Sequence, residues 1–408
     1  TTTMGAAAAR VALAARRDAV PSAVWFSTAE PAYLEKTNAN AIHAALRLPS
    51  STIALDFGGA VRSGIGALAA ALGAAGSTVL SVAADIRTGL PTGGDESAGG
   101  DAAAAILVGE GEDDELVAEY LGGASATAEF LDRWRVPGDP QTRQWEERFG
   151  ETQYGPLARE AWGEALRDAG LDGVDLVIVT GVHARAQRQV AKLVGDATLV
   201  DDLGLSVGNT GTAHAALVLA SALDSAAPGQ TIAVVSVVDG VDVVVLRVAA
   251  GVADHRPSPS TATQIHHGGP VSYAKFLQWR GQLPVQPPNR PAPNRISASA
   301  AARSESWKYG FVASKGDQSG LVHMPPARVS IRAEDSDDAQ LEVPMADARG
   351  TIVTFTVDRL VYSVSPPVVF AVIDFDGGGR MPMELTDADA DDVSIGDRVE
   401  LSFRRLFT

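Results

Sequence analysis

The sequence of 408 residues contains no cysteine. This absence excludes disulfide bonds, thiolate metal sites and a cysteine nucleophile from the chain. Long apolar runs are also missing, and none approaches the roughly 20 residues that a membrane-spanning helix needs. Basic residues are scarce, since 33 Lys and Arg stand against 50 Asp and Glu, for a net charge of −17. Such a charge repels nucleic acid and anionic membranes, so we expect neither as a partner.

The remaining composition is that of a globular protein, with 46% hydrophobic and 20% charged residues. At about 150 residues per domain, the length predicts two or three domains. The first residues, TTTMGAAAAR, lack the charged and then apolar layout of a signal peptide. We therefore expect a cytoplasmic protein.

The pattern along the chain divides it into three parts. Residues 1–254 alternate helical and strand patterns, which predicts a layered α/β domain. Within it, Thr231–Val238 and Val241–Ala249 are apolar at nearly every position, which is typical of central strands covered on both faces. Residues 255–303 form a Pro-rich linker, in which Val271–Arg280 has the spacing of a short docking helix. Residues 304–408 show closely spaced strands with Gly-marked turns, which predict a small all-β barrel.

One turn offers a candidate for chemistry. In the segment LDFGGAVRSGIGAL, a buried strand over Thr52–Asp56 is expected to run into a helix over Gly59–Gly73, with Asp56 at the N-terminus of that helix. Free amide groups and the helix dipole stabilise a negative charge there. Two interpretations stay open for Asp56: a plain helix N-cap, or a partly desolvated general acid or base.

Several segments together carry a family resemblance. They are Thr2–Ala14, FSTAEPAYLEKTNA, LDFGGAVRSGIGAL, ADIRTG with GGDAAAAILVGEG, VTGVHARAQ and SVGNTGTAHAAL. In order and spacing they resemble the thiolase superfamily, most closely its HMG-CoA synthase and ketoacyl synthase III branch. The resemblance implies a duplicated five-layer αβαβα fold with the active site between the halves. It also implies that a strand, a helix and a further segment are absent before the first segment. The first half-sheet would then lack a central strand and have an exposed edge for a partner to cover.

The same resemblance implies the site residues. A Cys on the strand-to-helix turn takes the acyl group in the family, and Asp56 occupies that place in this sequence. His183 and Asn209 match the family's His and Asn, and Glu30 is the nearest candidate for its acid/base Glu. Because a carboxylate that attacked a thioester would form a high-energy mixed anhydride, we do not expect covalent acyl transfer at Asp56.

The C-terminal part resembles the zinc-ribbon and OB-fold proteins that accompany thiolases and HMG-CoA synthases, on WKYGFVASKGDQSGLVHMPPARVSIRA and the strands after it. In those proteins two Cys pairs hold zinc. Here the four ligand positions are taken by Gly316, Ser319, Ser330 and Ala333. None of these side chains binds zinc, so we expect no zinc and a ribbon that is held by packing or is partly collapsed.

These observations predict a non-condensing accessory or scaffold subunit of an acyl-CoA thiolase or acyltransferase complex. It would self-associate and would bind acyl thioesters, delivered on CoA or on an acyl carrier protein, for a Cys-bearing thiolase partner. Arg62 and Arg185 are candidates to meet CoA phosphates, with ordinary ion pairing as the alternative. A second hypothesis is a retro-aldolase or C–C lyase for a 3-hydroxyacyl-CoA, in which Asp56 or His183 moves the proton and Asn209 holds the thioester oxygen. A third is an acyl-CoA binding protein.

Overall fold

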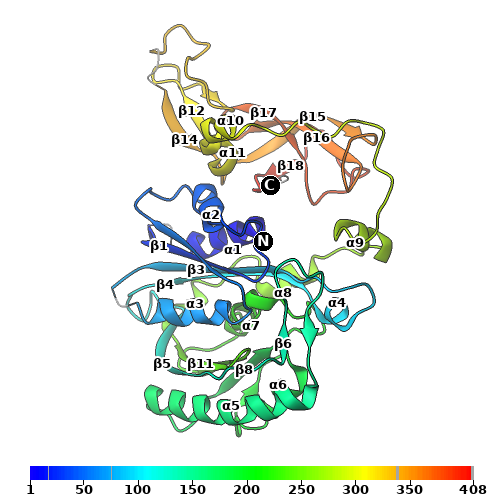
Figure 1. The fold of residues 1–408 in the computed structure, drawn as a ribbon. Helices are drawn as coiled ribbons and strands as arrows, with labels where there is room; N and C mark the ends of the chain where they lie inside the picture. Colours follow the sequence, from blue (N-terminus) through cyan, green and yellow to red (C-terminus); the bar gives the residue numbers. More distant parts are fainter. Residues whose placement is uncertain (17, 75, 337–339, 406–408) are drawn as a thin grey trace. The chain divides into compact units, whose positions relative to one another are not determined.

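The computed structural model describes residues 1–16, 18–74, 76–336 and 340–405, which divide into two compact units (Figure 1). Unit 1 comprises residues 1–43 and 48–270, and unit 2 comprises residues 44–47 and those from 271 onward. The Pro-rich segment 255–303 is therefore shared between the units. It contains three short helices rather than one: α8 (Thr261–His266), α9 (Tyr273–Trp279) and α10 (Ala298–Arg303).

The first sheet of unit 1 has the strand order β2-β1-β3-β4. Strand β1 (Ala23–Thr28) pairs in parallel with both β2 (Ile53–Gly58) and β3 (Val79–Ile86), while β4 (Asp101–Val108) is antiparallel to β3. Because β1 pairs directly with β3, the sheet has no gap where we expected a strand to be missing.

Strand β2 lies at an edge of this sheet. Its side chains Ile53 and Leu55 are 57% and 48% exposed. The predicted burial of this strand is therefore wrong, because its apolar residues lie on an edge strand that is open to solvent.

The second sheet of unit 1 has the order β5-β11-β10-β8-β9. Its members are β5 (Ala118–Ala126), β8 (Leu176–Gly181), β9 (Thr198–Leu199), β10 (Thr231–Val237) and β11 (Val241–Val248). Strands β8, β9 and β10 run parallel, and β11 is antiparallel to both of its neighbours. Nearly every side chain of β10 and β11 is buried, so their prediction as strands covered on both faces is confirmed.

Helices fill the layers around the two sheets (Figure 1). The helices α1 and α2 cover the outer face of the first sheet, α3 and α7 lie between the sheets, and α5 and α6 cover the outer face of the second sheet. Their bounds are α1 (Thr2–Ala14), α2 (Ala39–Ala45), α3 (Ser63–Leu72), α5 (Glu147–Ala169), α6 (Ala184–Val190) and α7 (His214–Leu223). These are the five alternating layers of the predicted fold.

The middle layer is closely packed because small residues line it. The 3-10 turn η1 (Gly211–Ala213) leads into α7 and touches α3. A Cβ atom on Gly64 of α3 would lie 1.9 Å from the carbonyl oxygen of Thr212. The two halves of unit 1 therefore meet backbone to backbone at this point.

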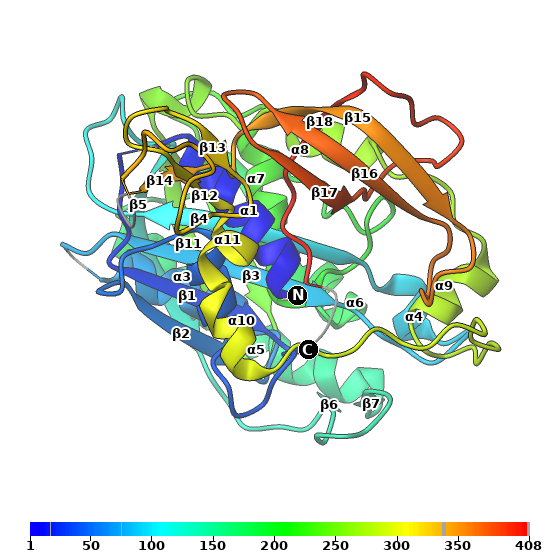
Figure 2. The ribbon, with the colours of Figure 1, turned by 90° about the horizontal axis from the view of Figure 1, so that it is seen from above.

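Unit 2 is built from short antiparallel strands. The ribbon sheet consists of β12 (Val312–Lys315), β13 (Val322–His323) and β14 (Leu341–Pro344), preceded by α11 (Glu305–Gly310). The other sheet of unit 2 has the order β17-β16-β15-β18, and its neighbouring strands lie side by side in Figure 2. Its strands are β15 (Arg349–Asp358), β16 (Val368–Phe375), β17 (Arg380–Glu384) and β18 (Arg398–Glu400). Every second side chain of β16 is buried, so this strand has one core face and one open face.

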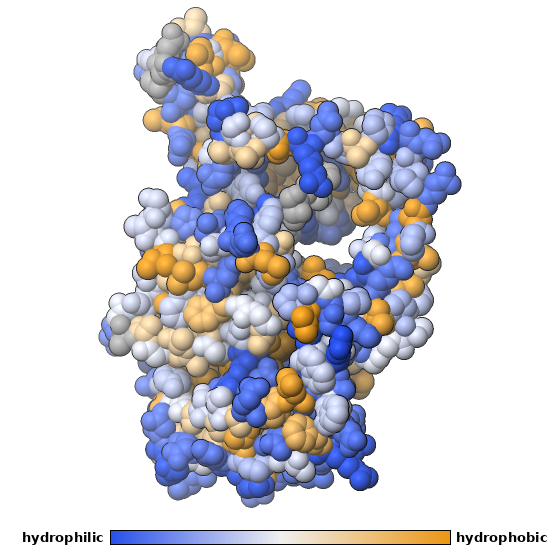
Figure 3. Space-filling model, viewed as in Figure 1, coloured by the Kyte–Doolittle hydropathy of each residue, from blue (hydrophilic) through white to orange (hydrophobic). Residues whose placement is uncertain are grey.

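Within the described ranges, no helix has both the length and the apolar character needed to cross a bilayer. On the face of unit 1 that Figure 3 shows, hydrophobic side chains are interspersed among hydrophilic ones.

Candidate functional site

Asp56 lies inside β2, two residues before the strand ends, and its carboxylate caps α2. Oδ2 accepts the backbone N–H of Asn38 at 2.7 Å and its side-chain amide at 3.0 Å, and Oδ1 accepts the N–H of Ala39 at 2.8 Å. The expected position of Asp56 at the N-terminus of α3 is therefore wrong. The strand continues to Gly58 before the chain turns, so the acidic side chain meets a different helix.

The turn between β2 and α3 begins at Gly59. This residue has a φ of +94°, and no described atom lies within 4 Å of the place where its Cβ would be. Glycine adopts such a left-handed backbone without strain. The first position of the turn therefore carries no side chain for chemistry.

His183 is buried, and backbone groups hold both nitrogens of its ring. Nδ1 accepts the N–H of Ala186 at 3.1 Å and so caps α6, while Nε2 lies 2.9 Å from the carbonyl oxygen of Glu147. An acceptor at Nδ1 requires the proton on Nε2, so these partners select one tautomer of the neutral imidazole. In this arrangement neither nitrogen is free to take a proton from a ligand.

Asn209 joins separate segments of unit 1. Its Nδ2 donates to the carbonyl oxygen of Gly181, and its Oδ1 accepts the N–H of Gly211 at 3.0 Å. Its backbone pairs with the segment at Gly99. An amide nitrogen carries two protons, and only one of those on Nδ2 has an acceptor in the described chain.

The structure brings His183 and Asn209 to the same end of β8, because Asn209 binds Gly181 and His183 follows two residues later. Asp56 is not part of this group. It lies on the edge strand of the other sheet, and no hydrogen bond in the described ranges connects it to His183 or Asn209.

Glu30 follows β1 and forms an ion pair with Arg135. At the same end of the sheet, the fully buried carboxylate of Asp85 accepts the hydroxyl of Thr28 at 2.9 Å and the N–H of Thr212 at 2.8 Å. Asp85 thus ties the two halves of unit 1 together.

Arg62 is a clamp between α3 and the β10–β11 hairpin. Its Nε and Nη2 reach the two carboxylate oxygens of Asp242 at 2.7 and 3.0 Å, Nη2 also reaches Thr127 at 2.9 Å, and Nη1 reaches the carbonyl oxygen of Asp239 at 2.7 Å. The hydrogen bond to Asp242 is the main reason why the pKa of Arg62 is raised. With all three nitrogens engaged, the geometry favours ion pairing over the CoA-phosphate alternative.

Arg185, the other CoA candidate, pairs with Glu147. The distance between Arg185 Nε and the carboxylate is 2.6 Å, and both side chains are about half exposed. Such exposed pairs are worth little in stability and leave other guanidinium protons open to solvent.

Asp132 is a buried acid that no sequence pattern indicated. It is only 3% exposed, and its two carboxylate oxygens have no hydrogen-bond partner in the described chain. It lies near Tyr154, whose ring centroid is 6.0 Å from that of His183. Burial raises the pKa of Tyr154 and of Asp239, and the charge of Asp132 raises both further. Tyr154 of α5 thus lies close to two other titratable side chains of unit 1, Asp132 and His183.

In unit 2 a carboxylate organises the turn where zinc was considered. Asp335 accepts the N–H and the hydroxyl of Ser319 at 2.7 and 2.6 Å and the N–H of Gln318 at 3.0 Å. The bonds from Ser319 are the main reason why the pKa of Asp335 is held well below its usual range. A Cβ on Gly316 would lie 2.1 Å from this carboxylate, so glycine admits it. Nowhere in the described ranges do three or more His, Cys, Asp or Glu side chains group as a metal site.

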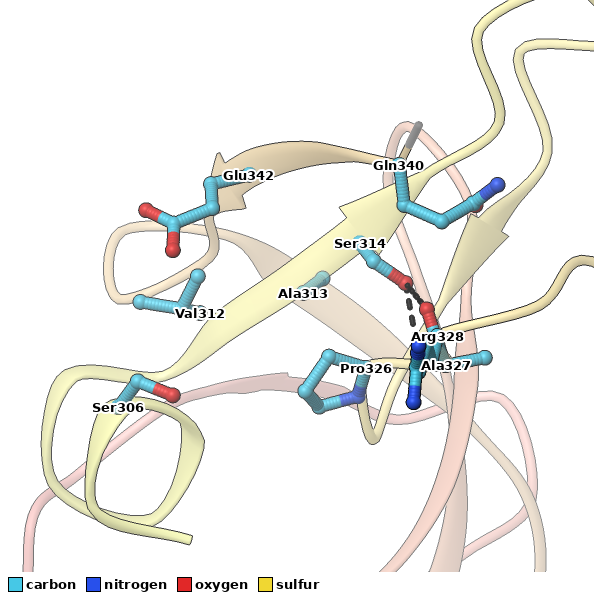
Figure 4. A pocket seen from close by; sticks show the side chains of 9 residues that line it. All are labelled: Ser306, Val312, Ala313, Ser314, Pro326, Ala327, Arg328, Gln340 and Glu342. Atoms are coloured by element: carbon cyan, nitrogen blue, oxygen red, sulfur yellow. Dashed lines mark hydrogen bonds between the residues drawn. The ribbon is translucent and has the colours of Figure 1, made fainter. Parts of the chain in front are cut away.

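Two surface hollows lie apart from these residues. One of about 300 Å³ borders β12 and β14, where Ser314 Oγ donates to the carbonyl of Ala327 at 3.0 Å and accepts its N–H at 2.9 Å (Figure 4). The other, of about 380 Å³, lies on α8. No candidate site residue lines either of them.

Known proteins resemble both parts of the chain. A hydroxymethylglutaryl-CoA synthase of Pyrococcus furiosus is 30% identical over 223 residues, which are 52% of this chain and 63% of that protein. The corresponding synthase of Thermococcus sibiricus is 30% identical over 278 residues, which are 64% of this chain and 77% of that protein. The chain thus spans slightly less than two thirds of the first relative and about three quarters of the second.

The C-terminal part has its own relatives. Residues 342–404 match the family model described as ChsH2, C-terminal OB-fold domain. A DUF35 domain-containing scaffold protein of Methanothermobacter thermautotrophicus is 29% identical over 102 residues, which are 24% of this chain and 75% of that protein.

The solved structure of an HMG-CoA synthase in complex with CoA shares the fold, with a TM-score of 0.57 at 17% identity over 68% of this chain and 77% of that one. The five-layer fold is thereby confirmed. The 30% identity to the Thermococcus sibiricus protein, of which the chain covers 77%, shows that the chain belongs to the hydroxymethylglutaryl-CoA synthase family, with a thiolase-like fold and a ChsH2-type OB-fold domain.

Proposed function

We propose that the chain is a non-condensing accessory subunit of an acyl-CoA thiolase or acyltransferase complex. It binds acyl thioesters and passes them to a thiolase partner that supplies the cysteine. The names of the relatives support this assignment, since one group is hydroxymethylglutaryl-CoA synthases and the other a scaffold protein. A fusion of both types in one chain suits a subunit that holds a ligand and a partner together.

The observation that carries the proposal is the lack of a nucleophile. The chain has no cysteine, and its strand-to-helix turn begins at Gly59. The carboxylate of Asp56 is held by α2, and both ring nitrogens of His183 are held by the backbone. Covalent acyl transfer needs an activated nucleophile beside a free base, and these residues provide neither.

The test compares this chain alone with a mixture of this chain and a Cys-bearing thiolase. Purified protein is incubated with radiolabelled acetyl-CoA and acetoacetyl-CoA, and both protein-bound label and condensed product are measured. We expect no bound label on this chain and no product without the partner. A partner whose nucleophilic Cys is replaced by Ala is the matched control, and it should abolish turnover. Condensation by this chain alone would refute the proposal.

A second candidate function, a C–C lyase that acts on a 3-hydroxyacyl-CoA without a covalent intermediate, is favoured by the group of Asp132, Tyr154 and His183. Titratable groups in a buried site are what such proton transfer requires. Asp132→Asn should slow cleavage by about 100-fold, as expected for the loss of an acid or base, while Asp56→Ala serves as the control. Cleavage at an unchanged rate in Asp132→Asn would remove this candidate.

A further inference from the structure

Arg87 is a cation placed where the two halves of unit 1 meet. It follows β3 directly, and a Cβ on Gly99 would lie 2.9 Å from the Cβ of Arg87. A Cβ on Gly211 would lie 3.0 Å from its Cδ. The apolar stem of Arg87 is therefore held between two glycines. Gly99 is also the bridge partner of Asn209, so Arg87 borders the residue whose second amide proton has no acceptor in the described chain.

The acids around Arg87 are already engaged. Asp85, Asp95 and Glu30 attract its guanidinium, and Arg133 repels it. However, Asp85 accepts donors from both halves, Asp95 is paired with Arg133, and Glu30 is paired with Arg135. The local charges thus favour a cation at Arg87 without giving it a partner of its own.

The backbone N–H of Arg87 donates to Asp101. Its guanidinium, in contrast, makes no hydrogen bond or ion pair within the described ranges. Burial lowers the pKa of Arg87 from its ordinary value. The side-chain nitrogens of Arg87 are nevertheless not fully buried, so a ligand can reach them. A guanidinium has five N–H donors, and those of Arg87 have no acceptor within the described ranges. A carboxylate or phosphate of a ligand would supply acceptors.

We propose that Arg87 binds an anionic group of the ligand, a carboxylate or a phosphate, at the junction of the two halves. The planar guanidinium suits two parallel hydrogen bonds to either group. The inference rests on the proposed function, in which the ligand is an acyl thioester, and it narrows the class. The anion is either a carboxylate at the acyl end or a phosphate of the carrier arm.

The experiment is calorimetric titration of the full-length chain, without a partner, with 3-hydroxy-3-methylglutaryl-CoA and with acetyl-CoA. Both probes carry the CoA phosphates, and only the first has a free carboxylate. Arg87→Gln should weaken binding about tenfold or more, as expected when a charge-assisted hydrogen bond is lost. Arg247→Gln, at a surface arginine paired with Glu119, is the matched control and should bind as the unmodified chain does.

The pattern of loss identifies the source of the anion. Weaker binding of only the carboxylate-bearing probe assigns the carboxylate, and an equal loss for both probes assigns a phosphate. Binding by Arg87→Gln within twofold of the unmodified chain, or no binding of either probe by the unmodified chain, overturns the inference. If Arg87→Gln fails to fold, Arg87→Lys replaces it, and unchanged binding by that variant overturns the two-bond geometry. Unchanged binding by Arg87→Gln overturns this inference and leaves the accessory role standing, whereas no binding of either probe by the unmodified chain also removes the thioester binding that the proposed function contains.

Discussion

Replacing Arg62 by Ala separates a structural role from a ligand-binding role at this residue. The pair it forms with Asp242 is largely buried, with 20% and 8% of the two side chains exposed. Removal of one partner from such a pair leaves an unpaired buried charge and costs about 3–5 kcal/mol. At roughly 2–4 °C per kcal/mol for a unit of this size, unit 1 should melt about 10 °C lower.

Urea unfolding and thermal melting measure this loss directly. Arg62→Ala with Asp242→Asn should recover part of the stability, since the carboxylate charge is then removed with its partner. Arg247→Ala, which breaks an exposed pair with Glu119, should cost less than about 1 kcal/mol. An Arg62→Ala protein that unfolds within about 0.5 kcal/mol of the parent, and yet loses affinity for CoA, would refute the clamp and return Arg62 to the CoA site.

Three further predictions concern other contacts. Gly64→Ala should destabilise unit 1 by about 3 kcal/mol, because its Cβ would collide with the carbonyl oxygen of Thr212. Gly66→Ala is the matched control, and with open space around its Cβ it should gain about 0.5–1 kcal/mol. Thermal unfolding measures both, and a Gly66→Ala variant less stable than Gly64→Ala would contradict this packing argument. Because the folded-state pKa of Asp335 is lowered, the stability that its carboxylate contributes is present at neutral pH and is lost as pH falls below about 4. Asp335→Asn should therefore flatten the acid side of a plot of urea unfolding midpoint against pH. A plot that the substitution leaves unchanged would contradict this role. Asp56→Ala should cost about 1 kcal/mol in unfolding free energy through the lost cap and leave any thioester chemistry intact, and a loss of turnover would restore Asp56 as a catalytic candidate.

The fold was predictable where periodicity was strong. The apolar runs of β10 and β11 and the alternation of β16 report burial directly, because side-chain direction repeats every two residues. Strand β5 was missed because its two central glycines weaken a strand pattern. In the structure those glycines have a packing reason, since a Cβ on Gly122 would lie 2.7 Å from the backbone nitrogen of Ala169 at the end of α5.

The site was predictable in chemistry but not in placement. An acidic residue before a helix suggests a cap, and Asp56 is one, but which helix it caps depends on where the strand ends. The unpartnered carboxylate of Asp132 has no local signature, since DRWR is a polar stretch that favours exposure. Its burial results from residues far along the chain, and a pattern of neighbours does not contain that information.

In the ribbon of unit 2, the carboxylate of Asp335 organises a turn through hydrogen bonds from Gln318 and Ser319. A fold built around bound zinc depends on a loading step and collapses when a chelator removes the ion. Here the organising group is part of the polypeptide and is complete as soon as it is synthesised. With no thiols to oxidise either, the C-terminal unit should keep its fold through metal starvation and peroxide stress that would dismantle a cysteine-bound ribbon.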